Sequence, residues 1–255
     1  MIRLKTKEEI RTMQDGGKRH AEILRALSEM VAPGLSTLFL EEEAQRLIHD
    51  GGDKAAFLGY TPVGAPRAYP AALCVSINQE IVHGIPNEEI RILKEGDIVS
   101  LDLGLIHKGL ITDAAVTVGV GAIDDESRKL LHITKLALEA GIKAAQPGNH
   151  VGDISEAIER TVHGSGFSIA EDLAGHGVGY AVHEDPFVPN MGHKGDGEEL
   201  VPGMVIAIEP MINIGKAAIK VMKDGYTIRT KDDSRSAHFE HTIAITEDGN
   251  IVLTQ

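Results

Sequence analysis

The sequence contains one cysteine, no tryptophan and few aromatic residues, and its scarcities exclude several classes of protein. A single cysteine, Cys74, rules out an intrachain disulfide, which is typical of proteins that fold in a reducing cytosol. No apolar run approaches the length needed to span a bilayer, and the first residues lack the apolar core of a signal peptide. We therefore expect a cytoplasmic protein without a membrane segment.

Basic residues are also in deficit. The 255 residues include 38 acidic and 25 basic ones, which gives a formal charge of -13 at pH 7. A nucleic-acid surface needs clustered lysine and arginine to neutralise phosphates, so this balance argues against one. The acidity indicates either a solvated surface or carboxylates gathered around a cation, and composition does not separate the two.

The order of the expected helices and strands predicts an α+β fold. A capping box at Thr6–Glu9 starts a helix that ends before Pro33, and a second helix covers about residues 37–48. Residues 59–70 are rich in glycine and proline and are expected to form a loop. Strands are expected at 98–105 and 110–118, helices at about 126–145 and 154–163, and strands again at 205–214 and 238–246.

A weak internal repeat indicates two related halves. Residues 95–102 resemble residues 202–209, because in each segment a glycine precedes an apolar strand and an acid follows six residues after the glycine. The order of helices before strands also recurs. We expect one domain, residues 1–255, made of two pseudo-symmetric helix-plus-β-meander halves, about 1–122 and 123–255, around a shared antiparallel sheet.

Asp102 and Asp113 are predicted to share one face of a β-hairpin. Asp102 interrupts an otherwise apolar strand, and Lys108-Gly109 has the composition of a two-residue turn. This turn puts Asp113 opposite Gly104 and diagonal to Asp102. Two carboxylates so close repel each other unless a cation lies between them, and Gly104 leaves room for one. The alternative is that the hairpin faces solvent and the two aspartates only solvate it.

Two glutamates and a histidine extend the metal hypothesis. Glu209 ends an apolar strand and Glu240 begins another, although either alone is typical of a surface acid at a strand end. His176 lies between two glycines, where it is either a turn residue or a metal ligand that other groups approach closely. Four carboxylates and one imidazole suit two divalent ions such as Mn, Fe(II), Co or Zn. Such two-metal sites activate water for hydrolysis.

Taken together, these motifs resemble the type I methionine aminopeptidases in their short bacterial form. The resemblance spans essentially the whole chain. The matching segments are Val82-His83-Gly84-Ile85-Pro86, Gly175-His176-Gly177-Val178-Gly179, His183-Glu184, Ile208-Glu209-Pro210-Met211 and Glu240-His241-Thr242. The resemblance implies the pita-bread fold and a metal-dependent hydrolase that removes the N-terminal methionine from nascent proteins and peptides, with a preference for a small second residue.

The resemblance also implies a role for each site residue. The two metal ions would be held by Asp102, Asp113, His176, Glu209 and Glu240. Of these, Asp113 and Glu240 would bridge the ions, and Glu209 would act as general base for a bridging hydroxide that attacks the first peptide bond. His83 would contact the scissile amide nitrogen, and His183 would hydrogen-bond the carbonyl oxygen.

The implied substrate pocket departs from the family in places. Its lining would be Phe57, Tyr60, Tyr69, Cys74, His83, Val182, His183 and Tyr226. Phe57 stands where some members carry cysteine, Val182 where some carry phenylalanine, and Tyr226 where some carry tryptophan. Residues 61–68 form a longer segment than in many members. We interpret these departures as drift among apolar pocket residues.

Two other functions fit parts of the same pattern. An Xaa-Pro aminopeptidase or prolidase would share the fold and the metals, but such relatives have a different histidine pattern and usually an additional N-terminal domain. A catalytically inactive pita-bread binding module would have lost ligands, whereas all five are present here. The expected partner is therefore the N-terminal methionine of nascent polypeptides. A transient ribosome contact stays open, and a monomer is expected.

Overall fold

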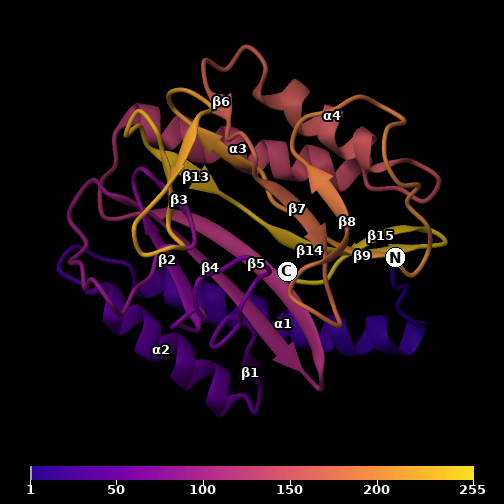
Figure 1. Cartoon of the computed structure of the whole chain (residues 1–255), viewed down its shortest axis with the longest axis horizontal. Coiled ribbons are helices and arrows are strands. Elements are labelled where there is room, and N and C mark those ends of the chain that lie inside the picture. Colours follow the sequence, from indigo (N-terminus) through magenta and orange to yellow (C-terminus); the bar gives the residue numbers. More distant parts are fainter. Residues whose placement is uncertain (1) are drawn as a thin grey trace.

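A computed structural model describes residues 2–255 and places two pairs of helices on opposite sides of a layer of strands (Figure 1). The helices are α1 (Lys7–Met30), α2 (Thr37–Asp50), α3 (Asp125–Ala144) and α4 (Val151–Val162). Figure 1 shows α1 and α2 below the strands and α3 and α4 above them. Each pair covers its own apolar core, with Leu27 and Leu40 fully buried in one and Leu130 and Ile154 in the other.

The strands of residues 2–255 are antiparallel wherever they pair, but they form four sheets rather than one. One sheet contains β1 (Lys54–Ala55), β2 (Leu73–Ile77), β4 (Ile98–His107) and β5 (Leu110–Gly119). The largest contains β7 (Ala174–Gly177), β8 (Glu184–Pro189), β9 (Val205–Ile208), β14 (His241–Thr246) and β15 (Gly249–Val252). Two small sheets contain β6 (Ser168–Ile169), β10 (Met211–Asn213) and β13 (Ser236–His238), and β3 (Glu80–Val82), β11 (Ile219–Val221) and β12 (Ile228–Thr230).

Helix α1 begins as the sequence predicts. The Glu9 N–H donates to the Thr6 hydroxyl at 3.2 Å, and the Thr6 N–H donates to the Glu9 carboxylate at 2.8 Å, so the capping box is confirmed. Residues at helical spacing, among them Met13 and Leu27, are buried. The other three helices lie close to their expected ranges. None of the helices in residues 2–255 has both the length and the hydropathy that a bilayer crossing requires.

The predicted hairpin between β4 and β5 is confirmed in turn and register. Lys108 and Gly109 have φ values of 49° and 86°, as a two-residue turn with two left-handed positions requires. Gly104 pairs with Asp113, and Asp102 pairs with Ala115. The two aspartates therefore stand on one face of the hairpin, in diagonal positions. A single bridge between Ala115 and Glu240 then joins β5 to the segment before β14.

The expected strands 205–214 and 238–246 are each interrupted at an acid. Residues 209 and 210 separate β9 from β10, and residues 239 and 240 separate β13 from β14. The pairs Ile208–His241 and Met211–His238 flank the two interruptions, so they lie opposite each other. Pro210 has no N–H to donate to a ladder, which explains one break. Glu209 and Glu240 are thus freed from the strict alternation of a strand.

A buried ion pair ties the segment before α1 to the first residue of β8. Lys5 Nζ lies 2.6 Å from Glu184 Oε2, and the two side chains are only 1% and 9% exposed. The other carboxylate oxygen of Glu184 accepts from the Ala181 N–H at 2.8 Å. The pair therefore orders the turn that carries Val182 and His183.

We expect Lys5→Met to lower the free energy of unfolding by about 3–5 kcal/mol, because Glu184 would be left buried without its counter-charge. Denaturant unfolding followed by circular dichroism measures this. Lys7→Met is the matched control, since Lys7 is 83% exposed and lies 3.4 Å from Glu247, and its loss should change stability by less than about 0.5 kcal/mol. Equal stability of the two variants would contradict the assignment.

Candidate metal centre and substrate cavity

One cavity of about 240 Å³ gathers all five residues that the sequence predicts as metal ligands. Asp102 and Asp113 come from the β4–β5 hairpin, and His176 comes from β7. Glu209 and Glu240 come from the two facing strand interruptions. All five are buried, with exposed fractions between 2% and 9%. The alternative that the hairpin aspartates only solvate an exposed face is therefore wrong.

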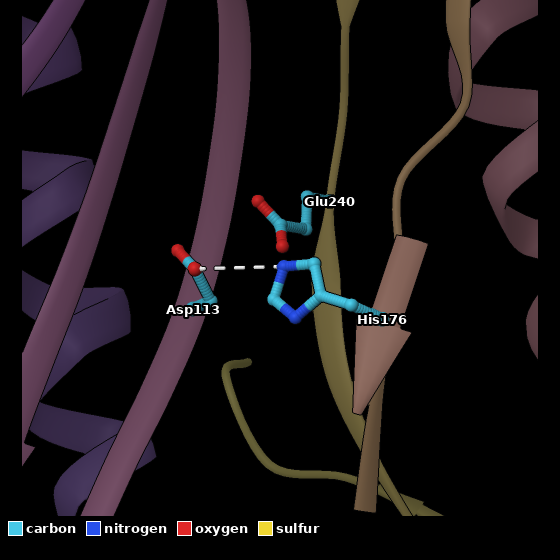
Figure 2. Close-up of side chains that lie close together, drawn as sticks. All are labelled: Asp113, His176 and Glu240. Carbon is cyan, nitrogen blue, oxygen red and sulfur yellow. Dashed lines mark ion pairs between the residues drawn. The ribbon is translucent and has the colours of Figure 1, made fainter. Parts of the chain in front are cut away.

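Three of these side chains form the tightest group. One ligand atom from each of Asp113, His176 and Glu240 lies within 4.8 Å of the other two. Figure 2 shows the three side chains reaching toward one another from three different segments of the chain. His176 Nε2 lies 3.9 Å from Asp113 Oδ2 and 3.4 Å from Glu209 Oε1. A cation placed among these atoms would have ligands from two different sheets, since Asp113 belongs to β5 and His176 to β7.

The hydrogen bonding of His176 leaves one ring nitrogen free to bind a cation. Its Nδ1 lies 2.9 Å from the Gly177 carbonyl oxygen, which only accepts, so Nδ1 carries the proton. Burial lowers the pKa of His176 to about 3, and the ring is neutral at pH 7. Nε2 then presents a lone pair toward the carboxylates. A hydrogen bond from the ring nitrogen that does not bind the metal is the usual way in which a protein orients a metal-binding histidine.

The carboxylates need protons or cations in this setting. Asp102 Oδ1, Asp113 Oδ1 and Glu240 Oε1 are buried without a hydrogen-bond partner. Burial raises the pKa of Asp102 to about 7 and that of Glu209 to about 8. It also raises the pKa values of Asp113 and Glu240 well above their ordinary range, and the neighbouring carboxylates add to the shift. Hard oxygen atoms with one imidazole fit divalent cations and do not resemble a thiolate zinc site.

Two glycine interpretations have different outcomes. A Cβ at Gly104 would lie 2.6 Å from Phe57 Cε1, so the space beside Asp113 is taken by an aromatic ring. The interpretation that Gly104 leaves room for a cation is therefore wrong. The glycines around His176 do permit a close approach, since a Cβ at Gly177 would lie 2.1 Å from the Asp185 carbonyl oxygen. The group that approaches is strand backbone rather than a ligand.

His238 is a site residue that the sequence reasoning missed. Its Nε2 lies 3.4 Å from Glu209 Oε2 and 3.9 Å from Glu240 Oε2, and the residue is 1% exposed. Burial lowers the pKa of this histidine. A signal was present in the sequence, because the expected strand 238–246 would have placed residues 238 and 240 on the same face.

All eight residues predicted for the substrate pocket line the same cavity as the acids. Tyr69, Cys74 and Tyr226 form one apolar cluster, against which Phe57 packs. The sequence reasoning missed further lining residues, namely Pro62, Ala65, Val82, Val221, Gly225 and Ile228. Val221 belongs to β11, Ile228 belongs to β12, and Gly225 lies between these two strands. Neither strand carries a polar motif that could mark these residues in the sequence.

His183 and His83 stand beside the acids. The rings of His183 and His176 are 4.5 Å apart, and the Tyr60 hydroxyl lies 2.9 Å from His183 Nδ1. Burial lowers the pKa of His83 to about 4, so this ring is neutral at pH 7. His83 also has a φ of 59°, a left-handed conformation that is uncommon outside glycine and that clusters at functional sites.

Comparison with known proteins identifies the family. Residues 11–247 match the model of metallopeptidase family M24. A methionine aminopeptidase from Aquifex aeolicus is 46% identical over 100% of this chain and 99% of its own length, and methionine aminopeptidase 1 from Bacillus subtilis is 42% identical over 100% of both chains. The crystal structure of methionine aminopeptidase from Thermotoga maritima, 44% identical, matches with a TM-score of 0.95 over 100% of both chains. The chain belongs to the methionine aminopeptidases of family M24.

Membership of the methionine aminopeptidases confirms the predicted pita-bread α+β fold and a hydrolytic enzyme. Prolidase from Pyrococcus furiosus also matches, with a TM-score of 0.77 over 99% of this chain and 65% of that chain, but it is only 23% identical. That likeness is one of fold alone. The relatives therefore do not favour the Xaa-Pro alternative.

The raised acid pKa values predict how metal-free protein responds to pH. Glu209 has a folded-state pKa of about 8 against an ordinary 4.5, so the folded state binds more protons than the unfolded state up to about pH 8. The free energy of unfolding then falls as the pH rises toward that value. The buried histidines act in the opposite direction only below their ordinary pKa of 6.5. We expect the Tm of chelated protein to fall between pH 6.5 and about pH 8.

Thermal melts of chelated protein across this pH range test the expectation. Glu209→Gln should flatten the fall, because it removes one of the responsible acids. Added Mn²⁺ should raise the Tm most at the upper end, where the carboxylates are ionised. A Tm of the chelated protein that stays constant or rises would contradict the burial of ionisable acids at this site.

Proposed function

We propose that this protein is a metal-dependent aminopeptidase that hydrolyses the N-terminal methionine from nascent proteins and peptides. The observation that carries the proposal is the convergence of four buried carboxylates and His176 in one cavity that also has an aromatic, apolar lining. Full-length similarity to methionine aminopeptidases supports the choice of substrate. Nascent chains are made in the cytoplasm, and the proposal locates the protein there. The predicted monomer and ribosome contact remain predictions.

The cavity would hold two divalent ions. The residues proposed to bind them are Asp102, Asp113, His176, Glu209 and Glu240, of which Asp113 and Glu240 would serve both ions. The unpaired oxygens of Asp102, Asp113 and Glu240 and the free Nε2 of His176 support this ligand set. When bound, the ions would supply a Lewis acid and a hydroxide nucleophile at neutral pH. Co, Mn, Fe(II) and Zn all suit the set.

The protein's own side chains handle the protons and the substrate. The Glu209 carboxylate would accept the proton of the attacking water, as a general base. His83, neutral at pH 7, would hydrogen-bond the scissile amide nitrogen. His183 would donate from Nε2 to the carbonyl oxygen on which negative charge develops.

Tyr60 is well placed to set the tautomer of His183. The cavity wall lowers the pKa of His183 by desolvation, so its ring is neutral at pH 7. When the Tyr60 hydroxyl donates to Nδ1 at 2.9 Å, the ring proton resides on Nε2. The nitrogen that must donate to the substrate is then the protonated one. Tyr60 therefore acts as a positioning residue for the transition-state donor.

We expect His183→Ala to lower kcat by roughly 10²-fold with little change in KM, because its hydrogen bond strengthens only in the transition state. Tyr60→Phe should lower kcat by roughly tenfold through loss of the tautomer preference. Steady-state kinetics on Met-Ala-Ser measure both. Tyr180→Phe is the control, since its hydroxyl bonds Glu9 at 2.9 Å and the residue does not line the cavity. A change confined to KM in His183→Ala would make this residue a ground-state binding group instead.

Substrate choice tests the proposed function directly. A bulky second residue would push the scissile carbonyl away from its partners, and the catalytic gain depends on that geometry. We expect Met-Gly, Met-Ala and Met-Ser peptides to be cleaved well, and Met-Leu, Met-Lys and Met-Glu peptides poorly, after chelation and re-addition of single divalent metals. An Ala-Pro dipeptide is the comparison for the Pro-specific alternative. Faster turnover of that dipeptide than of Met-Ala-Ser would refute the proposal.

A further inference from the structure

Residues 61–68 form a loop beside the substrate cavity whose two ends are held together. The Tyr69 N–H donates to the Tyr60 carbonyl oxygen at 2.8 Å, so the residues between them project as a closed loop. Within it, the Ala65 N–H donates to the Pro62 carbonyl oxygen at 3.0 Å. The loop is therefore a shaped element rather than an extended connection.

The inner side of this loop is part of the cavity wall. Pro62 and Ala65 line the cavity, and Ala65 packs against the apolar cluster that contains Tyr69, Cys74 and Tyr226. These are the residues proposed to surround the methionine side chain. The small, apolar side chains of the loop therefore close one side of that pocket.

Contacts from Arg67 fasten the loop to the rest of the protein. The guanidinium group makes a two-bond contact with the Glu88 carboxylate, with Nη2 2.7 Å from Oε2, and Nη2 also donates to the Asp224 carbonyl oxygen at 3.3 Å. The Tyr226 hydroxyl donates to the Arg67 carbonyl oxygen. Arg67 thereby joins the loop to two separate segments around the pocket.

The outer side of the loop has little else to hold it. Val63 is fully exposed, and Gly64 has a φ of 87° with open space around it. Pro66 contacts Gly225, where a Cβ would lie 2.8 Å from Pro66 Cγ. The position of loop 61–68 against the pocket thus depends mainly on the contacts that Arg67 and Pro66 make.

We propose that loop 61–68 is a specificity element of the methionine pocket and that Arg67 is the positioning residue that holds it against the pocket. The inference rests on the proposed function. Methionine is long, flexible and polarizable, so its terminal thioether gains from a close apolar wall. A short first residue would not reach the wall. Because the loop supplies none of the metal-binding side chains, loss of its anchor acts on substrate binding rather than on chemistry.

The test compares Arg67→Ala with wild-type holoenzyme on Met-Ala-Ser and Ala-Ala-Ser. We expect KM for Met-Ala-Ser to rise roughly threefold to tenfold, as loss of a well-oriented ion pair allows, while kcat stays within about twofold. The preference for Met over Ala as first residue should fall by a similar factor. Arg46→Ala is the matched control, because Arg46 makes the same kind of contact with Glu43, at 2.7 Å on the exposed side of α2, and it should leave both constants unchanged.

Two further measurements separate an anchoring role from a general loss of structure. The double charge reversal Arg67→Glu with Glu88→Arg should restore most of the wild-type KM. Since the pair is about 40% exposed, raising NaCl from about 0.05 to about 0.5 M should raise the wild-type KM and leave that of Arg67→Ala unchanged. An unaltered KM in Arg67→Ala, or an equal loss of kcat and metal content in that variant, would overturn the role of Arg67 and leave the proposed function standing. A wild-type enzyme that cleaves no Met peptide would overturn the proposed function and this inference with it.

Discussion

The burial of four carboxylates in one cavity is the constraint on which the rest of this structure depends. Asp102, Asp113, Glu209 and Glu240 face one cavity, and burial disfavours the charged form of every one of them. A fold can keep such a group only if its backbone is held by interactions that do not involve the acids. The two apolar cores and the long hairpin supply those interactions. The site is therefore held in place by its surroundings and stabilised by what it binds.

The part of the site that could be predicted from sequence is the part governed by local rules. A two-residue turn and strict alternation determine which residues share a face, and they place Asp102 and Asp113 correctly without any knowledge of the fold. Whole-chain resemblance then extended the set to His176, Glu209 and Glu240, which local rules leave ambiguous. Their convergence with Asp102 and Asp113 depends on contacts between segments more than sixty residues apart.

The parts that escaped prediction are set by tertiary packing. Phe57 fills the space beside Gly104 because the short strand β1 lies along β4, a pairing with no signal in the composition of residues 54–55. His238 went unnoticed because Glu209, one of the two acids beside its ring, lies at the end of a distant strand. Strands 205–214 and 238–246 were expected to run unbroken, whereas two facing interruptions let each chain segment pass from one sheet to another. Alternation cannot predict where a strand will leave its sheet.

The position of the acids relative to the two cores has a mechanical consequence. The hairpin that carries Asp102 and Asp113 packs with α1 and α2, whereas Glu209 and Glu240 adjoin strands that pack with α3 and α4. The Ala115–Glu240 bridge joins the backbones of these two sides at the site. An ion bound by acids from both sides would link the two sides, as a cross-link does. Unfolding of one side would then be coupled to unfolding of the other. The same atoms that serve hydrolysis would then also resist separation of the two sides of the fold.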